Sequence, residues 1–239
     1  DGVYEVVPVN RGRPFRLREH LVRLDDSLRS IRVKNPHTDA EWLAILGRLA
    51  AATGSQEALI YVQVTRGAEF GRNHLFPQGV TPTVFAFANP FPQPSAETLE
   101  RGLSAVTLED IRWDRCDIKS VALLGNVLLR QEAADAGADE ALLVRDGLLL
   151  EGSSSSVFLC IGGKLVTPPN SRRILPGTSR DAVLELAEGW LPYEICSLEA
   201  REIHSCEEAW IASAGRGVLP VTRVDGEPIG DGRPGPLWS

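Results

Sequence analysis

The sequence predicts a mixed α/β fold of the α+β class, arranged as two lobes. Three observations predict it. Segments with helical spacing of apolar residues are interspersed with segments that alternate like strands. The chain has 239 residues, enough for one large domain or two small ones. Near residue 110 the composition changes, from a Pro-rich connection to a long helix followed by several strands.

The first part of the chain predicts two helices among four strands. Leu21, Leu24, Leu28 and Ile31 recur at helical spacing, and the second helix ends before Gly54, as helices tend to. Residues 58–67 alternate as a strand does. The expected elements are strand 3–9, helices 18–33 and 39–53, and strands 58–67, 81–88 and 103–110.

The second part predicts a long helix at 120–138 and then four short strands between 140 and 168, separated by an Asp-Gly turn, a Ser run and a Gly-Gly turn. A helix at 179–189, with Ser179 as its N-cap, and a strand at 209–214 follow. We therefore expect an N-terminal lobe at 1–109, an interdomain segment at 110–117 and a larger lobe at 118–239. A small-molecule site between two such lobes is the usual arrangement.

Composition excludes several classes of function. The net charge of −7 disfavours a nucleic-acid surface, and no stretch approaches the roughly 20 apolar residues that a membrane span needs. The four cysteines lack metal-site spacing, which predicts no metal, no disulfide framework and a cytoplasmic location. The chain has no methionine and opens on a strand already under way, so we expect its start to be truncated. We also expect its end to be truncated.

Lys119 is the first candidate for chemistry. Lysine occurs only at positions 34, 119 and 164, and Lys119 alone borders an apolar run. A lysine with a buried stem and a solvated head is the ordinary interpretation. The alternative is a lysine that forms a Schiff base, because partial desolvation lowers the proton affinity of its amine.

Two further segments could bind an anionic ligand. Glu151 precedes the Ser run 153–156, which lies between apolar strands and so favours a tight polar turn facing a ligand over a linker. Glu151 could equally be an exposed turn acid. In "LPGTSRD" (175–181), Gly177, Thr178 and Ser179 lead into a helix whose N–H groups suit phosphate, although ordinary capping explains them too.

The loop 65–77 places Arg72 and His74 two residues apart after a strand. Arginine can bind a carboxylate through two hydrogen bonds, and histidine can add a donor. A solvated basic loop is the competing interpretation.

Taken together, these segments resemble the fold-type IV pyridoxal phosphate (PLP) enzymes, and within them the bacterial D-amino acid transaminases. The resemblance runs through nearly the whole chain and is carried by "DGVYEVV", "REHLVRL", "YVQVTRG", "EDIRWDRCDIKS", "LLGNVLLRQEA", "EGSSSSVF" and "LPGTSRD". It implies the fold-type IV architecture, with PLP between the lobes. "CDIKS" with "EGSSS" indicates the group, and Arg72-x-His74 the D-amino acid subtype.

The resemblance implies a role for each matching residue. Lys119 would hold PLP covalently and move the substrate proton, and Glu151 would pair with the pyridine nitrogen. The other implied cofactor contacts are Arg23 and the helix start at Thr178 and Ser179 for the phosphate, Leu175 against the ring, and Ser155 of the Ser run.

Tyr4, Arg72 and His74 match the group that traps the substrate carboxylate. In the family, the arginine and histidine come from the partner subunit, which implies a homodimer. The chain departs from the family pattern at Ser156, where asparagine is common, and at Ala214 and Gly215, where relatives carry hydroxyl residues.

The resulting hypothesis is transamination between a D-amino acid and a 2-oxo acid, of the type D-alanine plus 2-oxoglutarate. Three alternatives stay open: a branched-chain L-amino acid or (R)-amine transaminase, an aminodeoxychorismate lyase, and a non-catalytic PLP-binding protein. Side-by-side assays of D-alanine, L-leucine and (R)-1-phenylethylamine distinguish the transaminases.

Overall fold

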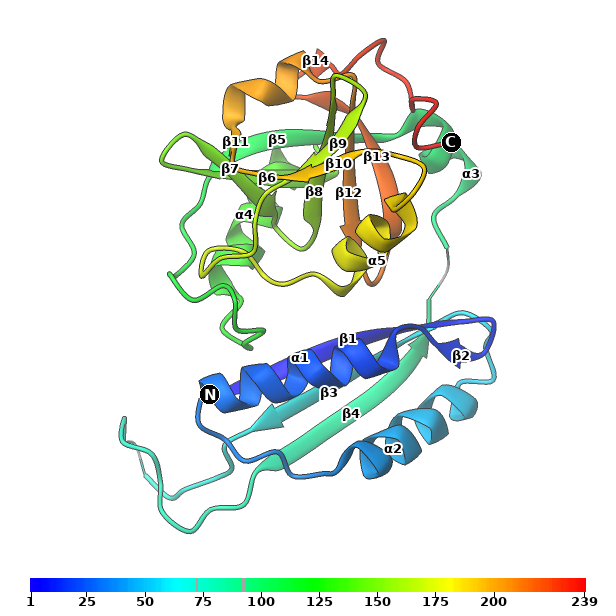
Figure 1. The fold of residues 1–239 in the computed structure, drawn as a ribbon. Coiled ribbons are helices and arrows are strands. Elements are labelled where there is room, and N and C mark those ends of the chain that lie inside the picture. Colours follow the sequence, from blue (N-terminus) through cyan, green and yellow to red (C-terminus); the bar gives the residue numbers. More distant parts are fainter. Residues whose placement is uncertain (72, 92) are drawn as a thin grey trace. The chain divides into compact units, whose positions relative to one another are not determined.

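A computed structural model describes residues 1–71, 73–91 and 93–239. The chain forms two compact units (Figure 1). Unit 1 comprises Asp1–Pro92 and Ile118–Ala122, and unit 2 comprises Gln93–Asp117 and Leu123–Ser239. The predicted α+β class is confirmed by the mixture of helices and strands in both units.

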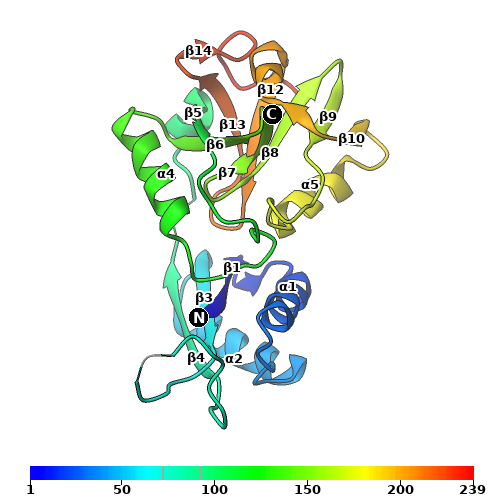
Figure 2. The same ribbon diagram turned by 90° about the vertical axis from the view of Figure 1, so that its left-hand side faces the viewer.

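Within the described ranges, unit 1 is a four-stranded antiparallel sheet in the order β2-β1-β3-β4. Both helices of the unit lie on one side of this sheet (Figure 2). The elements are β1 (Gly2–Asn10), β2 (Arg13–Pro14), α1 (Leu17–Ser30), α2 (Asp39–Ala52), β3 (Ala58–Thr65) and β4 (Thr83–Pro90).

The core of unit 1 follows from strand alternation. Val3, Val7 and Ile60 face the helices and are buried together with Leu24 of α1 and Trp42 of α2. Thr38 caps α2 in a capping box with Glu41, which explains why this helix begins where it does.

The described part of unit 2 holds a ten-stranded mixed sheet in the order β10-β9-β8-β12-β13-β5-β6-β7-β11, with β14 paired to β13. Helix α4 packs beside β5 and β6, and α5 packs beside β8 and β12. The elements are α3 (Ala96–Arg101), β5 (Leu103–Glu109), α4 (Leu124–Asp135), β6 (Glu140–Arg145), β7 (Leu148–Gly152), β8 (Ser156–Ile161), β9 (Lys164–Thr167), α5 (Thr178–Ala187), β10 (Tyr193–Ile195), β11 (Leu198–Glu199), η1 (Ala200–Ser205), β12 (Glu208–Ser213), β13 (Gly217–Val224) and β14 (Glu227–Pro228).

The predicted lobe boundaries at 109 and 118 were wrong. Strand β5, expected in the first lobe, pairs with β6 and β13 and buries Leu103 and Ala105 in the core of unit 2. Residues Ile118–Ala122, expected in the second lobe, belong to unit 1 and form a bridge between Ser120 and Val3. Composition locates a connection, but strand pairing decides which unit a segment joins.

Two predicted helix starts were also wrong. The long helix begins at Leu124 instead of 120, because the backbone just before it is engaged with β1. Helix α5 begins at Thr178, with Gly177 as its N-cap where the sequence favoured Ser179. Among the described residues, no helix is long and apolar enough to cross a membrane.

Candidate active site

The backbone of Lys119 is fixed in unit 1 by two hydrogen bonds, one through its carbonyl oxygen and one through its N–H. Its carbonyl oxygen accepts a hydrogen bond from the N–H of Tyr4 at 2.9 Å, and its N–H donates to Oγ of Ser27 at 3.2 Å. Ile118, the preceding residue, is buried in the core of the unit. The segment is therefore anchored, and the half-buried Lys119 side chain extends from a fixed backbone.

The amine of Lys119 lies over an aromatic ring. Its Nζ is 4.3 Å from the ring centroid of Tyr4, a cation–π distance. Tyr4 stacks on Tyr61 at 5.6 Å, and Tyr61 stacks on Phe87 at 5.3 Å. These rings lie on the sheet face opposite α1 and α2, because their strand neighbours point into the core. The structure thus brings together Lys119 and Tyr4, two predicted site residues.

Arg23 lies in a buried cluster with Glu5 and His20. Its Nε donates to Oε1 of Glu5 at 2.7 Å and its NH2 donates to Oε2 at 2.9 Å, while Nδ1 of His20 is 2.8 Å from Oε2. Burial acts to raise the pKa of Glu5, but the charge of Arg23 and the hydrogen bonds of His20 and Arg23 outweigh it and lower this pKa to about 2. The Arg23 guanidinium is therefore oriented by a carboxylate, and its contact with a phosphate stays a prediction.

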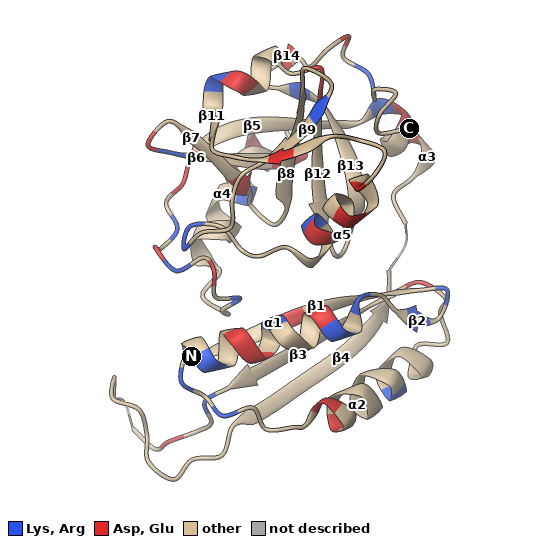
Figure 3. Ribbon diagram, viewed as in Figure 1, with Lys and Arg blue, Asp and Glu red and all other residues tan. Residues whose placement is uncertain are grey.

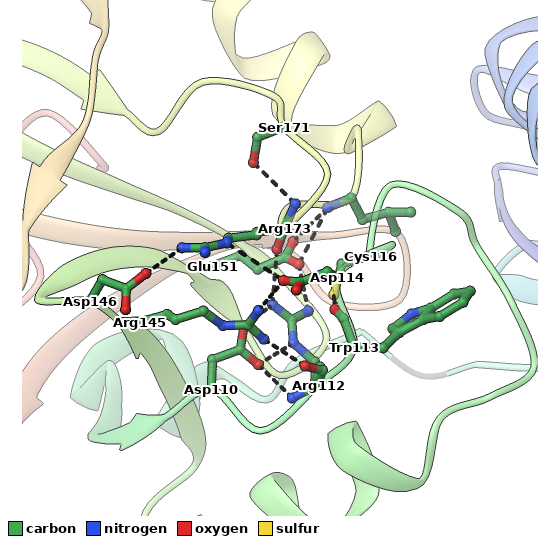
Figure 4. Close-up of polar contacts among 11 residues, drawn as sticks. Asp110, Arg112, Trp113, Asp114, Cys116, Arg145, Asp146, Glu151, Ser171 and Arg173 are labelled. Atoms are coloured by element: carbon green, nitrogen blue, oxygen red, sulfur yellow. Dashed lines mark hydrogen bonds and ion pairs between the residues drawn. The ribbon is translucent and has the colours of Figure 1, made fainter.

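Glu151 is the penultimate residue of β7 in unit 2 and is buried against Arg112 (Figure 4). NH1 of Arg112 donates to Oε1 of Glu151 at 2.6 Å, while Nε and NH2 of Arg112 donate to Asp110 at 2.8 and 3.1 Å. The N–H of Leu175 also reaches both oxygens of Glu151, at 3.3 and 3.2 Å. Glu151 is therefore not an exposed turn acid. The structure brings Leu175 beside it, and the contact of Leu175 with a cofactor ring stays a prediction.

Burial and the hydrogen-bond partners of Glu151 act in opposite directions on its pKa. Burial raises the pKa of Glu151 to about 7, although the charge and hydrogen bond of Arg112 act in the opposite direction. The pKa of Arg112 is raised above its usual range by Asp110 and Glu151 despite burial, so it stays charged. A carboxylate poised near neutrality will ionise fully when a second cation, such as a protonated ring nitrogen, is placed beside it.

The Ser run forms a turn in which Ser153 and Ser155 are buried while Ser154 is exposed. Oγ of Ser153 and Oγ of Ser155 both donate to the buried carboxylate of Glu140. The start of α5 lies next to this turn, because a Cβ added at Gly177 would meet Oγ of Ser156 at 2.5 Å.

Thr178 is buried and Ser179 is half-buried in the first turn of α5. The N-cap, Gly177, has no side chain that could cap this turn. The backbone N–H groups of the first turn are therefore suited to an oxyanion.

The predicted substrate loop is described only in part, since Arg72 lies outside the described residues. His74 is exposed. The loop is tied to unit 1 by Arg66, whose guanidinium carbon is 3.8 Å from the ring centroid of Phe76 and whose NH2 donates to the carbonyl of Ile31 at 2.7 Å. The carboxylate-binding role of Arg72 and His74 stays a prediction.

Sequence reasoning missed five residues that orient the predicted ones: Glu5, His20, Asp110, Arg112 and Glu140. Charged residues at inward positions of strands are a signal that could have found Glu5 and Glu140, because an unpaired charge is costly there. Asp110 and Arg112 carried no such signal, since they lie in an irregular segment rich in charges of both signs.

Comparison with known proteins defines the class of this protein. The sequence model of the amino-transferase class IV family matches residues 2–224, and the chain belongs to this family. It is 41% identical to D-alanine aminotransferase of Bacillus licheniformis, over 99% of this chain and 83% of the relative. It is 36% identical to the D-alanine aminotransferase of Staphylococcus haemolyticus, over 99% and 84% of the two chains.

Solved structures agree on the fold. The branched-chain amino acid aminotransferase of Escherichia coli superimposes with a TM-score of 0.90 at 26% identity, covering 99% of this chain and 82% of that one. The branched-chain aminotransferase of Thermoproteus uzoniensis gives 0.89 at 24% identity, with coverage of 99% and 81%, and supports the fold alone. The fold-type IV architecture is therefore confirmed, and the chain is a PLP-dependent aminotransferase.

The residues present fit PLP. The cofactor needs an amine for covalent attachment, an acid for the pyridine nitrogen and donors for the phosphate. Lys119 supplies a half-buried amine on an anchored backbone, and Glu151 supplies a buried carboxyl. The start of α5, with Gly177 as its N-cap, supplies backbone N–H donors. When bound, PLP withdraws electrons from the substrate carbon that loses its proton.

Proposed function

We propose that this aminotransferase transfers the amino group of a D-amino acid to a 2-oxo acid, in the manner of D-alanine plus 2-oxoglutarate giving pyruvate and D-glutamate. The observation that carries the proposal is the 41% identity with D-alanine aminotransferase along nearly the whole chain. Identity with the two branched-chain enzymes is lower, at 26% and 24%, although their fold is the same.

In the proposed reaction, Lys119 would hold the cofactor covalently until the amino group of the substrate displaces it. The freed amine would then remove the proton of the substrate Cα and deliver it to the cofactor, so that the amino group stays behind when the 2-oxo acid leaves. The Tyr4 ring beneath Nζ keeps the amine on one side and limits the directions in which it can move the proton. Positioned proton transfer of this kind contributes roughly 100- to 10,000-fold to a rate.

Glu151 holds the proton on the pyridine nitrogen in this proposal, because its carboxylate becomes ionised beside that cation. Leu175, fixed to Glu151 through its N–H, packs against the ring. Arg23 and the first turn of α5 bind the phosphate, Ser155 contributes from its turn, and Tyr4, Arg72 and His74 hold the substrate carboxylate.

We also propose that the chain works as a cytoplasmic homodimer, in which Arg72 and His74 serve the partner's site. The loop around them supports this, since Phe70 is fully exposed and Leu75 is 75% exposed. Phe85 and Phe87 add apolar surface on β4, a strand without charged residues (Figure 3). Large apolar side chains on such a surface favour a protein partner. Size-exclusion chromatography with light scattering tests this, and a monomer that retains full turnover would contradict it.

The test of the reaction uses Lys119→Ala. Wild-type protein mixed with PLP should show an absorbance band that borohydride bleaches, whereas Lys119→Ala should show no covalent attachment. Lys164→Ala is the matched control, because Lys164 is an exposed lysine paired with Glu194 and should keep the band. Normal turnover by Lys119→Ala would contradict the proposal.

Substrate class is tested by loss of the same band in half-reactions with D-alanine, L-leucine and (R)-1-phenylethylamine. D-alanine should react fastest. Faster reaction with L-leucine would instead indicate a branched-chain transaminase.

A further inference from the structure

A buried carboxylate lies beneath the Ser run in unit 2. Glu140, the first residue of β6, has no exposed surface. Its Oε1 accepts hydrogen bonds from Oγ of Ser153 at 2.5 Å and from the N–H of Ala141 at 3.1 Å. Its Oε2 accepts from Oγ of Ser155 at 3.2 Å and from NH2 of Arg216. One side chain therefore connects the Ser turn with a segment more than 60 residues further along the chain.

The Ser turn is built around this carboxylate. The N–H of Ser153 donates to the carbonyl of Ala141 at 3.0 Å, and Nδ2 of Asn126 donates to the carbonyl of Ser153 at 2.8 Å. Gly152 leaves the space in which the Ser155 hydroxyl turns inward, since an added Cβ would lie 2.1 Å from that oxygen. The hydroxyl hydrogens of Ser153 and Ser155 are thus directed at Glu140, which fixes the direction of the turn's backbone.

Arg216 lies in the link between β12 and β13, directly after Ala214 and Gly215. Its N–H donates to Oγ of Ser213 at 3.3 Å, and its guanidinium reaches Glu140. The ion pair between Arg216 and Glu140 therefore holds this link from within the protein.

We propose that Glu140 is a positioning residue for cofactor binding. With Arg216 as its partner, it holds the turn 153–155 and the link 214–216 in the arrangement that receives PLP. The inference rests on the proposed function, in which Ser155 contacts the cofactor. A buried ion pair adds little stability over apolar packing but can define one arrangement of the segments it joins. Breaking it should therefore lower cofactor affinity, in addition to the loss of stability that an unpaired buried charge brings.

The experiment titrates cofactor-free protein with PLP, follows the absorbance band, and measures the melting temperature of the cofactor-free form. Glu140→Gln and Arg216→Met should each raise the Kd for PLP about tenfold. In the double variant, the Kd for PLP should rise by much less than the product of the two single-variant factors, because both substitutions remove the same contact. Arg216→Lys keeps the charge and should restore much of the affinity.

Glu208→Gln is the matched control. Glu208 is a buried carboxylate of the same unit that accepts from Nε1 of Trp210 at 2.9 Å and from the N–H of Leu237 at 2.9 Å. Its substitution should lower the melting temperature and leave the Kd for PLP within about twofold.

Equal loss of melting temperature in Glu140→Gln and Glu208→Gln, with unchanged Kd in both, would overturn the inference and leave the role of Lys119 intact. If Glu140→Gln does not fold, Arg216→Met decides the matter, because its side chain is 27% exposed and its loss opens no deep cavity. Wild-type protein that acquires no band with PLP would overturn the proposed role of Lys119 and this inference with it.

Discussion

Replacing Arg112 by methionine should change the ionisation of Glu151 in a measurable way. Arg112 donates to Glu151 at 2.6 Å, and both side chains are 5% exposed. Two charges about 4 Å apart at an effective dielectric constant of about 20 interact by ~4 kcal/mol. Loss of this interaction should raise the pKa of Glu151 beyond its value of about 7, by roughly three pH units.

The sign of the effect on stability follows from linkage. The pKa of Glu151 is higher in the folded protein than its ordinary 4.5, so its contribution to stability is complete below pH 4.5 and is lost as the pH rises to about 7. The loss over this window is about 3 kcal/mol in the cofactor-free wild type. In Arg112→Met the free energy of unfolding should keep falling well above pH 7, because Glu151 has a higher pKa and ionises only at higher pH.

The assay is urea unfolding of cofactor-free protein between pH 4.5 and 9.5. For the wild type and for each variant, the free energy of unfolding is compared with that of the same protein carrying Glu151→Gln in addition. The contributions of all other titrating groups then cancel in the difference. Arg145→Met is the control, since Arg145 contacts Asp110 at 3.1 Å in the same cluster. For Arg145→Met, the free-energy difference plotted against pH should level off near pH 7, as in the wild type. A curve for Arg112→Met that also levels off near pH 7 would refute the reasoning.

Two further predictions concern the other anion-binding elements. Gly177→Ala should raise the Kd for PLP about tenfold, because the new Cβ would meet Oγ of Ser156 at 2.5 Å, and adding Ser156→Ala should restore affinity in the same absorbance titration. Glu5→Gln should remove acid sensitivity: the Glu5 pKa of about 2 contributes stability above pH 4.5 that is lost as the pH falls towards 2, about 3 kcal/mol in all. Urea unfolding at pH 3 and pH 6 captures about 2 kcal/mol of this contribution. An equal loss of stability in the wild type and in Glu5→Gln would show that the pKa of Glu5 is not lowered by folding.

Most of the secondary structure could be predicted because its signals are local. The apolar spacing of 18–33 and the Asp-Gly turn between β6 and β7 each act within a few residues. The start of α4 could not be predicted this way, since the backbone before it is engaged with β1, more than 100 residues earlier. The same holds for β5, whose pairing with β13 assigns it to unit 2.

The sequence by itself determined the family and the main chemical groups. Lys119 and Glu151 were candidates from local pattern alone, as a rare lysine beside an apolar run and an acid before a Ser run, although each also had an ordinary interpretation. Their family match is carried by short motifs, and the comparisons confirmed the class.

Only the tertiary structure decided how these groups are oriented and charged. Arg112 and Glu151 are 39 residues apart, and Glu140 and Arg216 are 76 residues apart. No local pattern identifies such partners, because each pair is created by the packing of distant strands and links. The pKa of a buried acid depends on its burial and its nearest cation, and both are properties of the folded chain.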